Sequence, residues 1–201
     1  RAGPGLPPHP ETPHMDTSDI KKDVKLMWDG QPYIVVEFQF VKPGKGQAFT
    51  RTKMKNLLTG GIIEKNIRSG EKLDPADVED RTLQYIYPDG DAYVFMHQQS
   101  GDQIVVNADV MGDGADLLVD GIDCVITLYR GNPVSVQLPP HVTVQIVETE
   151  PGVKGDTATN VTKPAKVSSG ATLPVPLFVN EGEWIKVDTR SREYLERVKA
   201  P

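Results

Sequence analysis

Lys45 stands between two glycines in the stretch VKPGKGQAF, residues 41–49. Lysine offers three hydrogen-bond donors on a flexible stem, and it is a frequent target of covalent modification. Gly44 and Gly46 allow positive φ on both sides of it and let the backbone lie close to a partner, while Pro43 stiffens the loop. The pattern predicts a slim finger whose ammonium enters a crevice of phosphates or ribose hydroxyls. The alternative is an ordinary solvated turn.

Four more cations flank this finger, and the sequence between Glu37 and Glu64 holds no acidic residue. They are Lys42, Arg51, Lys53 and Lys55, which we predict to lack acidic partners. Residues 15–70 hold ten Lys or Arg and six Asp or Glu, 81–143 hold two and eight, and 144–201 hold eight of each. A cation beside an RNA phosphate releases a condensed counterion. A local RNA-binding face is therefore compatible with a net charge of −6.

Catalytic patterns are absent from the sequence. No Ser–His–Asp or Cys–His–Asn spacing is present, and His97 and His141 stand alone without metal-ligand spacing. Cys124 alternates with apolar neighbours, which predicts a buried, inert thiol. We therefore expect no enzyme activity, no metal and no cofactor. A small hydrolase or transferase remains a weaker alternative.

The pattern of elements is strand, turn, strand, with 35 Gly and Pro residues to make the turns. We expect an all-β fold. About five strands over 22–70 would form a small SH3-like barrel, with the finger at the tip of one hairpin. Residues 69–81 read as a polar loop. Hairpins over 83–97 and 124–138, a short helix near 108–119 and a break at 138–141 suggest an OB barrel.

A third block follows, again with roughly five strands and a Gly- and Thr-rich loop near 152–161. Residues 191–200 fit either a strand or a turn of helix. We expect a disordered cloning leader over 1–14, an SH3-like barrel of the KOW type over 15–79, and OB folds over 80–142 and 143–201. No apolar run is long enough to span a bilayer.

Five stretches carry a family resemblance. They are FQFVKPGKGQAF, NLLTGGIIEKNIRSGE, YIYPDGDAYVFM, PPHVTVQIVETEPGVKGDTA and KPAKVSSGATLPVPLFVNEGEWIKVDTR. The chain resembles bacterial elongation factor P over nearly all of residues 18–199. This resemblance implies three β-barrel domains, an SH3-like barrel and two OB folds, in an L shape like that of tRNA.

The resemblance also implies a function. Such a protein would be a cytoplasmic, monomeric translation factor that binds the 70S ribosome beside peptidyl-tRNA, contacts ribosomal RNA and promotes peptide-bond formation at consecutive prolines. Lys45 would be the contact to the CCA end and the target of a lysine-modifying enzyme. Pro43, Gly44, Gly46 and Gln47 would shape its loop. The alternative is a general binder of single-stranded RNA with OB folds.

Two further residues align with family positions. Tyr194 and Arg197 match a tyrosine and an arginine that we expect to contact the ribosome, although Tyr194 also fits a packed barrel aromatic. Arg192 departs from the family pattern, because glycine is common at that position. A side chain there puts the local turn geometry in question.

Overall fold

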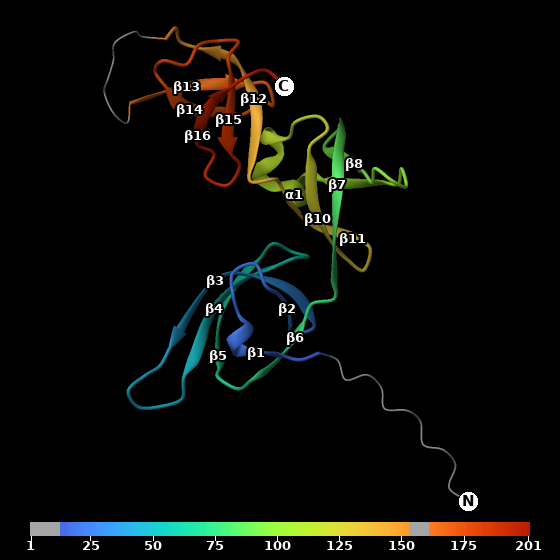
Figure 1. Ribbon diagram of the computed structural model, residues 1–201. Helices are drawn as coiled ribbons and strands as arrows, with labels where there is room; N and C mark the ends of the chain where they lie inside the picture. The colour runs from blue at the N-terminus through green and yellow to red at the C-terminus, as the bar shows by residue number, and fades with distance from the viewer. Residues whose placement is uncertain (1–12, 153–160) are drawn as a thin grey trace, which may run out of the picture. The chain divides into compact units, whose positions relative to one another are not determined.

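The computed structural model describes residues 13–152 and 161–201 (Figure 1). The predicted leader at 1–14 therefore lies outside the described residues except for its last two positions, as does most of the predicted loop at 152–161. Two compact units divide the chain, one ending at Val78 and the other beginning at Glu79. Three antiparallel sheets make up these units, which confirms the all-β prediction.

The first unit contains a six-stranded sheet and one short 3₁₀ helix, η1 (Thr17–Asp19). In spatial order its strands are β1 (Met15–Asp16), β6 (Lys72–Pro75), β2 (Lys25–Trp28), β3 (Gln31–Val41), β4 (Phe49–Asn56) and β5 (Ile62–Arg68). Leu26, Val35, Met54 and Ile67 are fully buried and form the centre of its core. Burying such side chains is the main source of stability for a sheet of this size.

The turn between β2 and β3 follows directly from its sequence. Asp29 and Gly30 have φ values of 53° and 76°. Positive φ at both central residues defines a type I′ turn, whose twist matches that of the strands it joins, and Asp-Gly favours it. The turn closes a hairpin in which Trp28 pairs with Gln31.

The prediction of a polar loop over residues 69–81 was wrong. β6 lies within it and pairs with both β1 and β2, and the long strand β7 (Val78–Asp89) begins before the segment ends. Only Leu73 of β6 is a buried apolar residue. A four-residue strand with one core side chain leaves no alternating pattern in the sequence.

The second unit begins with a five-stranded sheet in the order β11, β10, β7, β8, β9. Its remaining strands are β8 (Ala92–Met96), β9 (Gln103–Asn107), β10 (Asp123–Tyr129) and β11 (Asn132–Gln137). The expected helix is α1 (Ala108–Met111), which continues as the 3₁₀ segment η2 (Gly112–Leu117). Gly112 ends α1 with a φ of 63°, a conformation that glycine adopts at little cost.

A second five-stranded sheet completes this unit, in the order β14, β13, β12, β15, β16. Its strands are β12 (His141–Thr149), β13 (Thr162–Val167), β14 (Thr172–Pro176), β15 (Trp184–Asp188) and β16 (Tyr194–Val198). The open choice for residues 191–200 is therefore resolved as a strand.

The two sheets of the second unit share apolar side chains. Leu117 is the last residue of η2, beside the first of these sheets, but is fully buried in the core of the other. Ile122 and Leu138 pack against both cores. The two sheets therefore form one continuous packed body rather than two barrels joined only by chain. Cys124 lies in this body at 1% exposure, as predicted, and burial raises the pKa of its thiol to about 12.

Candidate nucleic-acid interface

The predicted finger is the outer end of the β3–β4 hairpin. β2 pairs with β3 only over Gln31–Ile34, so from Glu37 to Val41 the ladder partner of β3 in the described chain is β4. Figure 1 shows this end of the hairpin extending beyond the rest of its sheet. A loop of residues 42–48 closes it, and the Lys45 side chain is exposed there.

The two glycines of the loop differ. Gly46 has a φ of 117°, where a side chain would be strained, whereas Gly44 has no positive φ. The prediction of positive φ on both sides of Lys45 was therefore right for Gly46 alone. A Cβ atom added at Gly44 would meet no other atom within 4 Å. Nothing in the described chain requires glycine at position 44.

The second half of the loop is tied to the neighbouring strand. The Gln47 side-chain amide donates a hydrogen bond of 3.1 Å to the Ser69 carbonyl, and the Ser69 amide donates one of 2.9 Å to the Ala48 carbonyl. These bonds fix the C-terminal side of the finger to the end of β5. Motion of the finger is therefore restricted from this side, while the Lys45 amine remains in solvent.

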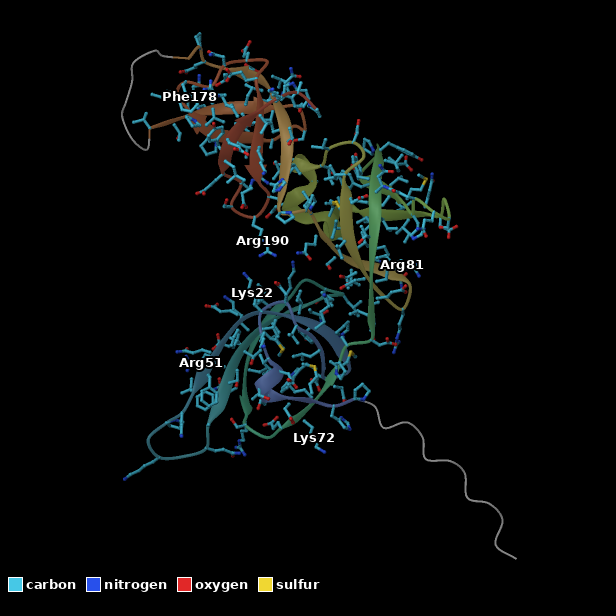
Figure 2. The ribbon with its side chains drawn as sticks, in the orientation of Figure 1. Lys22, Arg51, Lys72, Arg81, Phe178 and Arg190 are labelled. Carbon is cyan, nitrogen blue, oxygen red and sulfur yellow. The ribbon has the colours of Figure 1, made fainter. Side chains whose placement is uncertain are left out.

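The prediction that the flanking cations lack acidic partners was wrong for two of them. Arg51 lies 3.7 Å from Glu64, and Lys53 lies 3.9 Å from Glu37. Strand pairing is the reason, because Lys53 lies opposite Glu37 on β3 and opposite Glu64 on β5. Glu37 and Glu64 stand at the two ends of the stretch without acidic residues, and both are therefore cross-strand neighbours of Lys53. Figure 2 labels Arg51 on the projecting hairpin.

The other three cations of the hairpin are Lys42, Lys45 and Lys55. Each is exposed, and none has an ion pair among residues 13–152 and 161–201. Exposed ion pairs contribute about 0–1 kcal/mol, so those of Arg51 and Lys53 can exchange for phosphate contacts at little cost. The hairpin therefore offers up to five cations to a polyanion.

Tyr194 and Arg197 lie on β16 in the second unit, so the described structure does not unite them with the hairpin. The Tyr194 ring packs against the core of its sheet, 6.3 Å from the Phe178 ring at 77°, and burial raises the pKa of its hydroxyl. The Arg197 guanidinium lies 4.8 Å from the centre of the Phe178 ring and 3.4 Å from Glu183. Arg197 and Phe178 remain exposed to a partner.

Arg192 has a structural role that the sequence did not reveal. Its φ of 61° keeps the left-handed conformation typical of glycine, and its guanidinium forms two hydrogen bonds to Asp116, of 2.9 and 2.5 Å. A third bond of 3.2 Å reaches the Asp113 carbonyl. The arginine therefore joins β16's turn to the helical segment of the neighbouring sheet.

The described residues also bear on a metal site and a membrane span. Over residues 13–152 and 161–201, no three or more His, Cys, Asp or Glu side chains are grouped to hold a metal ion. In the same residues, no helix has the length and apolar character needed to cross a membrane.

Three family models match successive parts of the chain. The elongation factor P (EF-P) KOW-like domain matches residues 16–73, the elongation factor P (EF-P) OB domain matches 78–136, and the model described as elongation factor P, C-terminal, matches 134–197. A curated protein, elongation factor P of Persephonella marina, is 51% identical over 181 residues, which cover 90% of this chain and 95% of that protein.

One of two aligned solved structures shows a likeness of fold. Eukaryotic translation initiation factor 5A from Methanococcus jannaschii aligns with a TM-score of 0.51 and 20% identity, over 67% of this chain and 100% of that one. A translation initiation factor eIF-5A family protein from Naegleria fowleri aligns with a TM-score of 0.43 and 17% identity, over 63% and 99%.

Three β-sheet domains, a cationic hairpin and these matches define the class: the protein is a translation elongation factor and not an enzyme. The chain belongs to the elongation factor P family. The resemblance carried by its sequence motifs is thereby confirmed.

Proposed function

We propose that this elongation factor binds the 70S ribosome beside peptidyl-tRNA and promotes peptide-bond formation at consecutive prolines. The observation that supports this most is the exposed Lys45 amine at the end of a projecting hairpin, with no ion pair in the described chain. The amine is free to reach the CCA end of the tRNA. Pro43, Gly44, Gly46 and Gln47 shape the loop that presents it.

The proposed mechanism is positioning. Proline is a poor nucleophile and a stiff acceptor in this setting, and reactants held slightly off geometry lose several powers of ten in rate. A protein that steadies the CCA end restores geometry without supplying a catalytic group. The cations Lys42, Arg51, Lys53 and Lys55 contact RNA phosphates, and Tyr194 and Arg197 contact the ribosome through the second unit.

The proposal also covers the protein's compartment, oligomeric state and partners. The protein acts as a monomer in the cytoplasm, with ribosomal RNA and peptidyl-tRNA as its partners, through an SH3-like domain at 15–79 and OB domains at 80–142 and 143–201. A lysine-modifying enzyme lengthens the Lys45 side chain. Intact mass of protein from its native host tests this last step. The proposal predicts one adduct on the peptide around residue 45, and an unmodified peptide would contradict it.

The experiment is a reconstituted translation system with a message that encodes consecutive prolines. The variant Lys45→Ala should keep its melting temperature, because an exposed tip contributes little to stability, and should lose rescue by tenfold or more, consistent with a positioning role. The matched control is Lys65→Ala, which removes an exposed lysine from β5. Rescue by Lys45→Ala at the wild-type rate would contradict the proposal.

A general RNA binder behaves differently. It would bind a free single-stranded RNA as tightly as it binds ribosomes, whereas the proposal predicts clear preference for ribosomes in co-sedimentation. The acidic second block, with two basic and eight acidic residues over 81–143, favours the ribosome-specific function because it repels a bare phosphate chain.

A further inference from the structure

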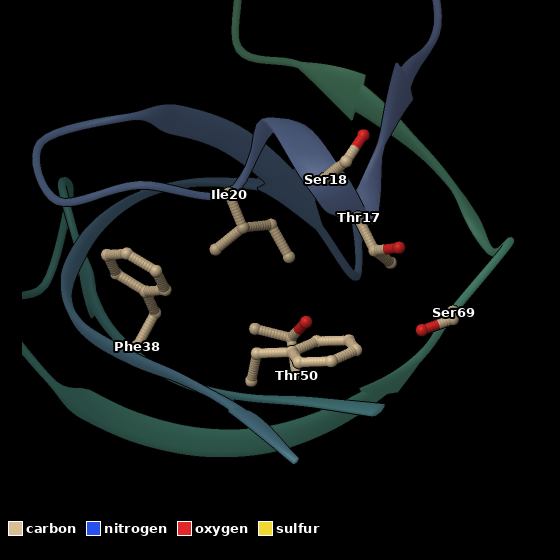
Figure 3. A pocket seen from close by; sticks show the side chains of 7 residues that line it. Thr17, Ser18, Ile20, Phe38, Thr50 and Ser69 are labelled. Carbon is tan, nitrogen blue, oxygen red and sulfur yellow. The ribbon is translucent and has the colours of Figure 1, made fainter. Parts of the chain in front are cut away.

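A pocket of 390 Å³ lies at the base of the finger, inside the first unit. We call it the Phe38–Phe40 pocket, and it is lined by Thr17, Ser18, Ile20, Phe38, Phe40, Thr50 and Ser69. Figure 3 shows the side chains of Phe38, Ile20 and Thr50 around the same space. Its volume falls within the range of pockets that hold small planar groups.

Two phenylalanine rings are left open at this pocket. Phe38 is 44% exposed and Phe40 is 60% exposed, although they lie two apart on β3 and share one face of the strand. Their partners on β4 are Thr52 and Thr50. β2 pairs with β3 only as far as Ile34, so beside Phe38 and Phe40 the described sheet has β4 on one side of β3 and no strand on the other. The rings therefore meet solvent where a core would otherwise continue.

The polar side chains of the pocket have no protein partner. Thr17 is 8% exposed and Thr50 is 4% exposed, yet neither hydroxyl has a hydrogen bond within the described residues. The hydroxyls of Ser18 and Ser69 likewise have none in that part of the chain. In the described residues the buried side-chain oxygen without a partner is Ser169 Oγ, so the pocket hydroxyls are accessible and can exchange bound water for a ligand. Aromatic faces beside such hydroxyls suit a flat ligand with hydrogen-bonding edges.

We propose that the Phe38–Phe40 pocket receives an unstacked base of the RNA that the finger engages. Charge favours RNA over a neutral partner, because the end of the same hairpin carries Lys42 and Lys45, which are exposed and have no ion pair in the described chain. Arg51, Lys53 and Lys55 alternate with Thr50 and Thr52 along β4 and lie on its other face. Bases stack on aromatic side chains, and hydroxyls read their edges. The Gln47–Ser69 bond joins the Lys45 loop to a residue that lines the pocket, so one RNA can contact both.

This inference rests on the proposed function, since the RNA would belong to the ribosome or its peptidyl-tRNA. The first test is ribosome affinity of the full chain. Phe38→Leu and Phe40→Leu keep apolar bulk but remove the aromatic face, and each should weaken binding roughly tenfold, as expected for one stacked base. Phe40→Trp should retain affinity. The matched control is Tyr87→Leu, which removes another exposed aromatic residue at 45% exposure.

A second variant guards against a folding defect. Thr17→Val removes a hydroxyl with no protein partner, so its melting temperature should not fall, whereas its ribosome affinity should fall several-fold. A loss of stability with unchanged affinity would show a packing role and overturn the proposal.

The second test identifies the occupant. A photoreactive benzoylphenylalanine replaces Phe40, ribosomes carrying peptidyl-tRNA are added, and irradiation should join it to an RNA nucleotide. The same group at Tyr87 reports background. Crosslinks confined to protein, or no crosslinks above background, would overturn the pocket proposal while wild-type co-sedimentation and rescue left the proposed function intact. A wild-type chain that failed to bind ribosomes would contradict both.

Discussion

Gly44 and Gly46 flank the same lysine, but the protein needs them for different reasons. Folding requires glycine at position 46, because a side chain would be strained at its φ of 117°. Gly46→Ala should lower the free energy of unfolding of the first unit by about 1 kcal/mol. Thermal or denaturant unfolding measures this, and an unchanged midpoint would show that the loop adopts another conformation.

Gly44 has no such folding requirement, because an added Cβ would meet open space. Gly44→Ala should therefore leave the unfolding midpoint unchanged. Rescue at consecutive prolines should nonetheless fall, because a methyl group there keeps the backbone away from a closely packed partner. If both stability and rescue stayed at wild-type values, close approach at position 44 would be excluded.

Cys124 gives a prediction about pH. Burial raises the pKa of its thiol from 9.0 to about 12. The folded state then holds a proton that the unfolded state releases above about pH 9, so the stabilisation is complete below pH 9 and is lost as pH rises toward 12. The free energy of unfolding should fall by about 1.4 kcal/mol per pH unit in that window. Denaturant titrations with Cys124→Ala as the reference measure the difference, and parallel pH profiles would contradict it.

Arg192 and Asp116 join the turn before β16 to the helical segment η2. Loss of a two-bonded, partly exposed ion pair costs about 1 kcal/mol, so Asp116→Ala should destabilise the second unit by that amount. Arg192→Gly should cost less, because glycine removes the strain of a φ of 61°. A double-mutant cycle measures their coupling. Zero coupling energy would mean that the pair contributes nothing in solution.

The elements also show what the sequence could and could not provide. The Asp29–Gly30 and Arg130–Gly131 turns could be predicted because Asp-Gly and Arg-Gly-Asn-Pro are turn signals in a sequence. In the structure both residues of each turn adopt positive φ. β6 could not be predicted, because its single buried apolar residue, Leu73, gives no alternating pattern in the sequence. The ion pairs of Arg51 and Lys53 depend on strand register, which charge counting along the chain does not contain.

The two sheets of the second unit share core side chains, so we expect them to unfold together. Leu117 leaves the helical segment of one sheet and is fully buried in the core of the next. Leu117→Ala should cost 2–5 kcal/mol, as buried leucines do. Hydrogen exchange should then show both sheets of the second unit losing protection together. Met54→Ala, in the core of the first unit, is the control and should affect that unit alone. Loss of protection in only one sheet would contradict a shared core.

Motifs predicted the family and function more fully than they predicted contacts. The sequence predicted the projecting hairpin with Lys45 and the three β-sheet blocks, because these depend on local residue types. It did not reveal the open face of β3 or the bridge from Arg192, because both arise where separate elements meet. The Phe38–Phe40 pocket, for example, is lined by residues from η1, β3, β4 and the segment after β5.

We propose that residue 45 reaches the CCA end of peptidyl-tRNA, and directed cleavage of that tRNA tests this contact. Lys45→Cys provides a unique reactive thiol, since Cys124 is buried and its thiol has a pKa of about 12. An iron chelate tethered at position 45, on ribosomes carrying peptidyl-tRNA, should cleave the 3′ end of that tRNA. The same chelate at Lys65→Cys is the control. The account predicts strong cleavage at the CCA end from position 45 only, and a ribosome-bound protein that leaves the CCA end uncut would contradict it.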